Sequence, residues 1–128
     1  EELHNMTRWV VDNLGPDVPM HFTAFHPDWK MMDIPSTPPD TLTRARTIAL
    51  ENGVHYAYTG NVHDAAGGST WCHACGQKLI GRDWYELSDW HLDAQGCCDQ
   101  CGTPVAGVFE AKPGHWGARR QPVHLAAV

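Results

Sequence analysis

All five cysteines of the chain lie in two short stretches, "TWCHACGQKLIGRDW" beginning at Thr70 and "GCCDQCGTPVAGVFE" beginning at Gly96. Each stretch contains the motif Cys-x-x-Cys-Gly, in which one tight turn can direct both sulfurs to a single point and the glycine permits the backbone that the turn needs. Two such turns supply four thiolates in a tetrahedron. The spacing therefore predicts a closed zinc site of the ribbon type, with the ligands Cys72, Cys75, Cys98 and Cys101.

Other uses of these cysteines remain open at this point. Iron of the rubredoxin type takes the same four ligands, and an iron–sulfur cluster or disulfides are further alternatives. A thioredoxin-type redox pair would need one Cys-x-x-Cys at the start of a helix rather than two in β turns. Cys97 precedes the second motif, so we expect a spare thiol there, with replacement of Cys98 as the alternative. Because a closed four-thiolate zinc has no open position for water, its expected role is structural.

Two further stretches carry polar side chains directly after predicted strands, "AFHPD" (24–28) and "TGNVHD" (59–64). In α/β folds, chemistry gathers on the loops at the carboxyl ends of parallel strands. His26 and His63 are therefore candidate functional residues. The alternative is that these stretches only cap their loops, with Asx turns at Asn61 and Asp64 and a solvent-exposed imidazole at His63.

The elements that position these residues alternate between helix and strand. Leu3, Met6, Val10 and Leu14 form one apolar helical face, which ends at Gly15-Pro16. "MHFTAF" (20–25) reads as a strand. A second helix opens at Thr37-Pro38 and ends before Gly53, and "VHYAYTG" (54–60) reads as the next strand. Short links between these elements predict parallel strands with right-handed crossovers.

The rest of the chain has a different pattern. Residues 64–70 read as a flexible hinge, the stretches 78–82, 84–92 and 105–110 as short β segments, and residues 112–128 as a closing loop with one possible strand. Two parallel strands cannot cover their own faces. We therefore expect the first part to be a slice of a larger α/β sheet or barrel, and the start at Glu1 rather than Met agrees with a fragment.

Composition narrows the possible partners. The chain has 128 residues, with nine Lys+Arg against fifteen Asp+Glu and a formal net charge of −6. Proteins that grip nucleic acid usually carry a basic face, so we expect no nucleic-acid partner. No apolar run approaches the roughly 20 residues that span a bilayer, so we expect no membrane partner. Cysteines in metal-type pairs fit a reduced compartment, the cytoplasm.

Several long motifs resemble those of a known family, the radical SAM enzymes of the AmmeMemoRadiSam system, which are similar to pyruvate formate-lyase activating enzymes. The motifs occur in the family's C-terminal order and cover nearly the whole chain: "LGPDVPMHFTAFHPDWKM", "TPPDTLTRARTIALENGVHYAYTGNV", "TWCHACGQKLIGRDWYEL", "CGTPVAGVF" and "WGARRQPV". Two departures are clear. The Cys-x-x-x-Cys-x-x-Cys motif that holds the family's four-iron cluster is absent, and "HDAAGG" replaces the usual Pro-Gly-His after "GNV".

The resemblance implies an α/β fold class: the last βα units of a partial TIM-like radical SAM barrel (residues 1–66), then a small β zinc ribbon (67–112) and a C-terminal tail (113–128). His26 matches a family histidine that approaches S-adenosylmethionine, and is the predicted cofactor-binding residue. S-adenosylmethionine and the iron–sulfur cluster belong to the complete enzyme only. The implied partners are the N-terminal barrel portion and an unknown protein or small-molecule substrate.

Three functions follow as expectations. The first is the C-terminal portion of a radical SAM enzyme, inactive on its own. The second is a stand-alone zinc-ribbon module that binds protein; residues 67–112 carry three basic and six acidic side chains, which argues against nucleic acid. The third is a rubredoxin-like electron carrier.

Overall fold

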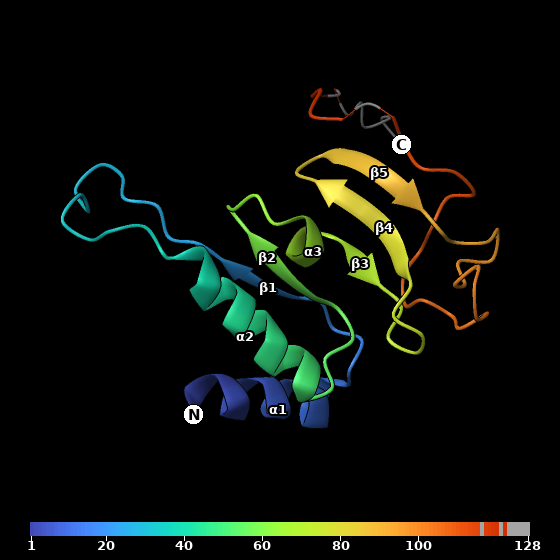
Figure 1. Cartoon of the computed structure of the whole chain (residues 1–128), viewed down its shortest axis with the longest axis horizontal. Helices are drawn as coiled ribbons and strands as arrows, with labels where there is room; N and C mark the ends of the chain where they lie inside the picture. The colour runs from blue at the N-terminus through green and yellow to red at the C-terminus, as the bar shows by residue number, and fades with distance from the viewer. Residues whose placement is uncertain (116, 121, 123–128) are drawn as a thin grey trace, which may run out of the picture.

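The computed structural model describes residues 1–115, 117–120 and 122, and these form two units that differ in strand direction (Figure 1). The first unit alternates helices with two parallel strands: α1 (Glu2–Leu14), β1 (Met20–Thr23), α2 (Pro39–Glu51) and β2 (Ala57–Gly60). The second unit, residues 69–110, is here called the cysteine unit. It contains an antiparallel sheet of β3 (Thr70–Trp71), β4 (Lys78–Asp83) and β5 (Glu86–Trp90). The predicted α/β units and the cysteine-bearing antiparallel sheet are thus confirmed.

The parallel unit buries one face of its sheet under a helix. β1 and β2 pair in register from Met20↔Ala57 to Thr23↔Gly60, and α2 packs on both strands while α1 packs on α2. The core of this layer is small and apolar, with Ala49, Val54 and Ala57 buried and three larger side chains against them: Val11, Met20 and Phe22. Since side chains alternate along a strand, His21 and Tyr58 project from the opposite face, where their rings stack.

The ends of the helices agree with the sequence in part. Gly15 and Gly53 have φ values of 91° and 93°, the left-handed conformation that glycine accepts at the end of a helix. At the start of α2, however, Pro38 rather than Thr37 is the N-cap, and no side chain caps the helix. Thr37 instead accepts a hydrogen bond from the Phe25 amide (3.0 Å), so its hydroxyl ties down the long loop after β1.

The cysteine unit shares its core with the parallel unit. Its buried cluster contains Cys72, Leu79, Ile80, Leu92, Cys98, Val105 and also Tyr56, which directly precedes β2. The Tyr56 hydroxyl accepts a hydrogen bond from the Ala106 amide (3.0 Å), so one residue of the parallel unit joins both sides of the core. The antiparallel sheet and β2 therefore pack as neighbours, as Figure 1 shows, with α3 between them.

Two stretches differ from the prediction. Residues 64–70 are not simply a hinge, because Ala65–Gly68 form the single-turn helix α3. The predicted β segment 105–110 is wrong: Gly107 has φ 152° and Val108 is fully exposed, so the alternation that a strand needs is lost. The possible strand within 112–128 falls partly on residues outside the described part of the chain. None of the described helices has the length and apolar character needed to cross a membrane.

Candidate metal centre

The two Cys-x-x-Cys-Gly motifs fold into matching turns. Cys72 donates its amide to Gln77 O (2.8 Å) and Cys98 donates its amide to Thr103 O (2.9 Å). The glycine that follows each motif returns a hydrogen bond to the carbonyl of the first cysteine, at 2.9 and 2.8 Å. These two glycines, Gly76 and Gly102, have φ of 75° and 74°, which a side chain would disfavour. The same local chemistry thus builds both halves of the site.

The four sulfurs converge on one point. Cys72, Cys75, Cys98 and Cys101 place their sulfurs within 4.8 Å of one another, and we call them the four-cysteine cluster. The Sγ–Sγ distances are 3.6 Å between Cys72 and Cys101 and 3.7 Å between Cys75 and Cys98. Four thiolates at about 2.3 Å from a tetrahedral zinc stand about 3.8 Å apart, whereas a disulfide needs about 2.05 Å. The residues present therefore fit a metal ion such as zinc, and all five cysteines are free thiols.

The cluster lies at the edge of the core. In each turn the first cysteine is buried and the second is exposed, so Cys72 and Cys98 face the core while Cys75 and Cys101 face solvent. All four positions of a tetrahedron are filled by protein sulfur. A metal held there has no position for water or substrate, which is typical of a structural site.

The thiols have unequal proton affinities. Hydrogen bonds from the Thr103 hydroxyl and then the Thr103 amide lower the pKa of Cys101 to about 6. For Cys75 the Gln77 amide lowers the pKa, but desolvation and the neighbouring thiols outweigh it and raise the pKa to about 12. Without a cation, a negative charge on one of these neighbouring sulfurs disfavours ionisation of the others. A divalent cation removes this conflict, because it stabilises all four thiolates together.

Cys97 is not a member of the four-cysteine cluster. Its amide donates to Asp93 Oδ1 (2.9 Å) and its carbonyl accepts from the Asp93 amide (2.9 Å), which fixes the chain just before the second turn. Nearby, His91 Nδ1 lies 3.0 Å from Asp99 Oδ2. These contacts shape the turn from outside and place no further ligand atom with the four sulfurs.

The two predicted histidines occupy different settings. His26 is exposed in the loop after β1. His63 lies in the loop after β2, where its Nδ1 is 3.3 Å from Asp83 Oδ1 and 3.2 Å from the indole nitrogen of Trp84. The hairpin tip of the cysteine unit thus reaches the carboxyl end of β2. Asn61 bridges the two strand ends, because its side-chain amide donates to Ala24 O (3.3 Å).

Asp64 is the N-cap of α3. Its carboxylate accepts hydrogen bonds from the Gly67 amide (2.9 Å) and from Thr59 Oγ1 (3.0 Å). The Gly67 amide is the largest cause that lowers the pKa of Asp64, and Thr59 adds to it against desolvation. This matches the alternative interpretation, in which Asp64 caps its loop.

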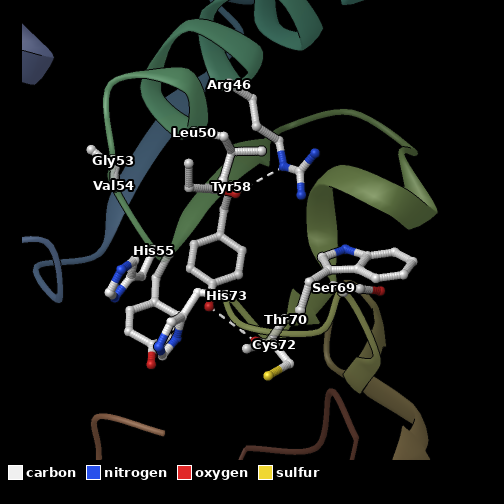
Figure 2. A pocket seen from close by; sticks show the side chains of 14 residues that line it. Arg46, Leu50, Gly53, Val54, His55, Tyr58, Ser69, Thr70, Cys72 and His73 are labelled. Carbon is white, nitrogen blue, oxygen red and sulfur yellow. Dashed lines mark hydrogen bonds between the residues drawn. The ribbon is translucent and has the colours of Figure 1, made fainter. Parts of the chain in front are cut away.

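The junction between the two units is built by aromatic residues that are not among the predicted site residues (Figure 2). The imidazoles of His55 and His73 stack face to face, with ring centroids 3.8 Å apart and planes 4° apart. Burial, and then His55, lower the pKa of His73. The Tyr58 hydroxyl lies 2.9 Å from Thr70 Oγ1, which also accepts a hydrogen bond from Arg82 (2.6 Å).

One signal for this junction was present in the sequence. Tyr56 and Tyr58 alternate with small residues in "VHYAYTG", a pattern that points large polar-tipped rings to one face. Thr103, two residues after Cys101, was likewise missed. Its hydroxyl lies 3.2 Å from the Cys101 sulfur and serves as an outer-layer contact of the cluster.

No protein-family model matches the chain, and no solved structure matches it significantly. Among curated proteins, the chain is similar to the uncharacterized protein MJ0808 of Methanocaldococcus jannaschii, with 40% identity over 106 residues. The matched region covers 82% of this chain but 32% of the relative. The chain therefore spans about a third of the length of a relative that it closely resembles.

Proposed function

We propose that the four-cysteine cluster holds one zinc ion that stabilises the fold. The observation that carries this proposal is the convergence of four sulfurs within 4.8 Å, from two turns of the same geometry. The core around them is small, and it includes two of the four cysteines themselves. Zinc binding to such a unit contributes folding free energy directly.

A matched pair of adjacent cysteines tests this proposal. Cys98→Ser removes a ligand and should abolish stoichiometric zinc in the purified chain, while Cys97→Ser should retain it. Metal content is measured by elemental analysis, and folding by the dispersion of backbone amide signals in NMR spectra. Equal zinc content in both variants would refute the assignment.

We further propose that the chain is the C-terminal portion of a radical SAM enzyme of the AmmeMemoRadiSam type. The motifs in the sequence support this. The match to 32% of a longer relative supports only that the chain resembles a portion of a larger protein. In that enzyme, an iron–sulfur cluster held by the N-terminal portion would reductively cleave S-adenosylmethionine. This chain would complete the barrel wall, present His26 to the cofactor and add the zinc ribbon.

The open side of the parallel unit supports a larger sheet. β1 pairs only with β2 among the described residues, so its outer edge has no neighbouring strand. A groove of about 570 Å³ runs beside that edge, with apolar lining from both helices and the strand: Leu3, Met6, Met20, Phe22 and Leu42. Parallel sheets are normally covered on both faces and continue beyond two strands. A further βα unit from the same longer protein would fit this groove.

The test of this second proposal uses the complete protein. The coding sequence around this chain should contain a Cys-x-x-x-Cys-x-x-Cys motif, and the reconstituted protein should release 5′-deoxyadenosine from S-adenosylmethionine under dithionite. Absence of the motif or of the product would refute the radical SAM proposal. It would not affect the zinc proposal.

Two alternatives keep the same cysteines. A stand-alone protein-binding module would carry zinc but need no further strands, and a rubredoxin-like electron carrier would hold iron. The four-sulfur geometry fits iron as well as zinc. A red protein with visible charge-transfer absorption would favour the electron carrier, and a colourless one favours zinc.

A further inference from the structure

A groove lies at the junction of the two units, beside the four-cysteine cluster, with Cys72 in its wall, and away from the carboxyl ends of the parallel strands (Figure 2). Its volume is about 540 Å³, within the range of small-molecule sites. α2, β2 and the start of the cysteine unit all contribute to its walls. The residues used below are Arg46, Leu50, His55, Trp71 and His73.

The described lining of the groove contains one permanent cation in an acidic protein. The chain has fifteen Asp+Glu against nine Lys+Arg, yet no Asp or Glu is among the described residues that line the groove. Arg46 supplies a permanent positive charge, because a guanidinium stays protonated. Arg46 is therefore the fixed positive charge of the groove wall. Cys72 of the four-cysteine cluster also lines the groove, and the Asp17 carboxylate lies 2.8 Å from His55 Nδ1.

The guanidinium of Arg46 is held in place by one of its nitrogens. Nε donates to Ala57 O (2.9 Å), as the dashed line in Figure 2 shows. Among the described residues, no acceptor bonds to the two terminal nitrogens, and no carboxylate forms an ion pair with Arg46. The charge of Arg46 contributes to the lowered pKa of Asp64, but the carboxylate oxygens of Asp64 accept hydrogen bonds from the Gly67 amide and the Thr59 hydroxyl. A fixed guanidinium with open terminal N–H groups matches the geometry of a carboxylate or phosphate.

Flat rings line the same groove. The stacked His55 and His73 pair forms one part of the wall. Trp71 forms another, and its indole nitrogen is already engaged by Ala66 O (2.9 Å), so the ring offers its apolar surface. Together with Leu50, these side chains suit a planar, partly apolar body.

We propose that this groove binds a small organic anion, whose carboxylate or phosphate pairs with Arg46 and whose planar body lies against Trp71 and the His55–His73 pair. The proposal concerns residues outside the four-cysteine cluster. It stands whether or not the chain belongs to a radical SAM enzyme.

The experiment titrates the isotope-labelled, zinc-loaded chain with four probes and follows the Arg46 Nε–H and Trp71 indole signals by NMR. Benzoate and phenyl phosphate should shift both signals at millimolar concentration. Benzamide, which has the shape of benzoate without its charge, should bind at least about tenfold more weakly, the size of one lost charge-assisted hydrogen bond. Inorganic phosphate should bind more weakly than phenyl phosphate, because it lacks the planar body.

Variants of α2 provide the matched comparison. Arg46→Gln should weaken benzoate binding at least about tenfold, whereas Arg44→Gln, an exposed arginine on the same helix, should bind like the wild type. Leu50→Trp keeps Arg46 but should obstruct the groove, and should therefore weaken benzoate binding as well. This variant keeps the proposal testable if Arg46→Gln does not fold. Comparison of benzoate with phenyl phosphate identifies the preferred anion. Equal binding of benzoate by wild type and folded Arg46→Gln, or no binding of either aromatic anion, would overturn the proposal.

Discussion

The residue with the clearest influence on the four-cysteine cluster, apart from the ligands, is Thr103. Its hydroxyl lies 3.2 Å from Cys101 Sγ and lowers the pKa of that thiol. A hydroxyl that donates to a metal-bound thiolate orients the ligand and spreads its charge. This contact gives a test that changes no ligand.

We predict that Thr103→Val weakens zinc affinity about tenfold, the lower end of what outer-layer partners of metal ligands contribute. Thr103→Ser keeps the hydroxyl and should bind zinc almost as tightly as the wild type. Competition with a chromophoric chelator measures both affinities. If valine and serine variants bind equally, the hydroxyl has no role in the site.

A second prediction at this scale concerns His26 and depends on the proposed enzyme. In the complete protein, His26→Ala should weaken S-adenosylmethionine binding by about 1–3 kcal/mol, the cost of leaving a buried polar partner unsatisfied. Asp28→Ala, two residues further along the same exposed loop, is the control. Equilibrium binding under anaerobic conditions measures the effect, and unchanged affinity together with unchanged turnover would reduce His26 to a loop residue.

Among the elements, α3 shows most clearly where sequence reasoning stops. "DAAGGST" is rich in glycine and reads as flexible, yet Asp64 caps one helical turn there. Gly67 is required rather than merely tolerated, because a Cβ at that position would overlap Thr59 Oγ1 and the Asp64 carboxylate. That contact depends on β2, so a local pattern could not reveal it.

The α3 cap gives a prediction with a defined pH dependence. The pKa of Asp64 is lowered in the folded chain, so its stabilisation is complete above the unfolded value of about 3.9 and is lost as pH falls through the folded value. At pH 7, Asp64→Ala should cost about 1 kcal/mol of unfolding free energy. The exposed Asp12→Ala should change it by less than about 0.5 kcal/mol.

Urea unfolding at several pH values checks this expectation. The difference between wild type and Asp64→Ala should shrink as the pH drops from neutrality to below about 4, while metal loss at low pH affects both proteins alike. A difference that stays constant with pH would mean that the carboxylate charge contributes nothing.

The sequence predicted some of the other elements correctly and others not. Apolar spacing located α1 and α2, and short stretches rich in aromatic and β-branched residues located both parallel strands, because these signals are local. The prediction of a β segment at 105–110 was wrong. Val105 is buried whereas Val108 is fully exposed, and this difference in burial arises from the tertiary packing of Val105 with Tyr56 and the buried cysteines. The metal ligands were predictable because their spacing encodes their own local turns. The junction groove was not, since Arg46 and Trp71 are brought together only by the fold.

At the scale of the whole molecule, the two units are coupled through Tyr56. This residue of the parallel unit lies in the same core as Cys72 and Cys98, and burial raises the pKa of its phenol, which stays protonated. The domain boundary between residues 66 and 67 remains a prediction. The shared core implies that loss of the metal also destabilises the parallel unit. Anything that loosens this core should also loosen the cluster.

We therefore predict that Tyr56→Ala destabilises the chain by about 3 kcal/mol and also weakens zinc affinity, because folding and metal binding are linked. Tyr56→Phe removes only the hydrogen bond to Ala106 and should cost about 1 kcal/mol. Tyr85→Ala, with a side chain 69% exposed, is the control. Thermal unfolding and chelator competition should change together; a drop in stability with unaltered zinc affinity would mean that the units are independent.

The most direct test of the central claim is X-ray absorption at the zinc edge on the purified chain. The account predicts one zinc per chain, surrounded by four sulfurs at about 2.3 Å with no nitrogen or oxygen ligand. The spectrum should be unchanged in Cys97→Ser and lost in Cys98→Ser. Iron in place of zinc, a mixed ligand shell, or a disulfide between the two motifs would contradict it.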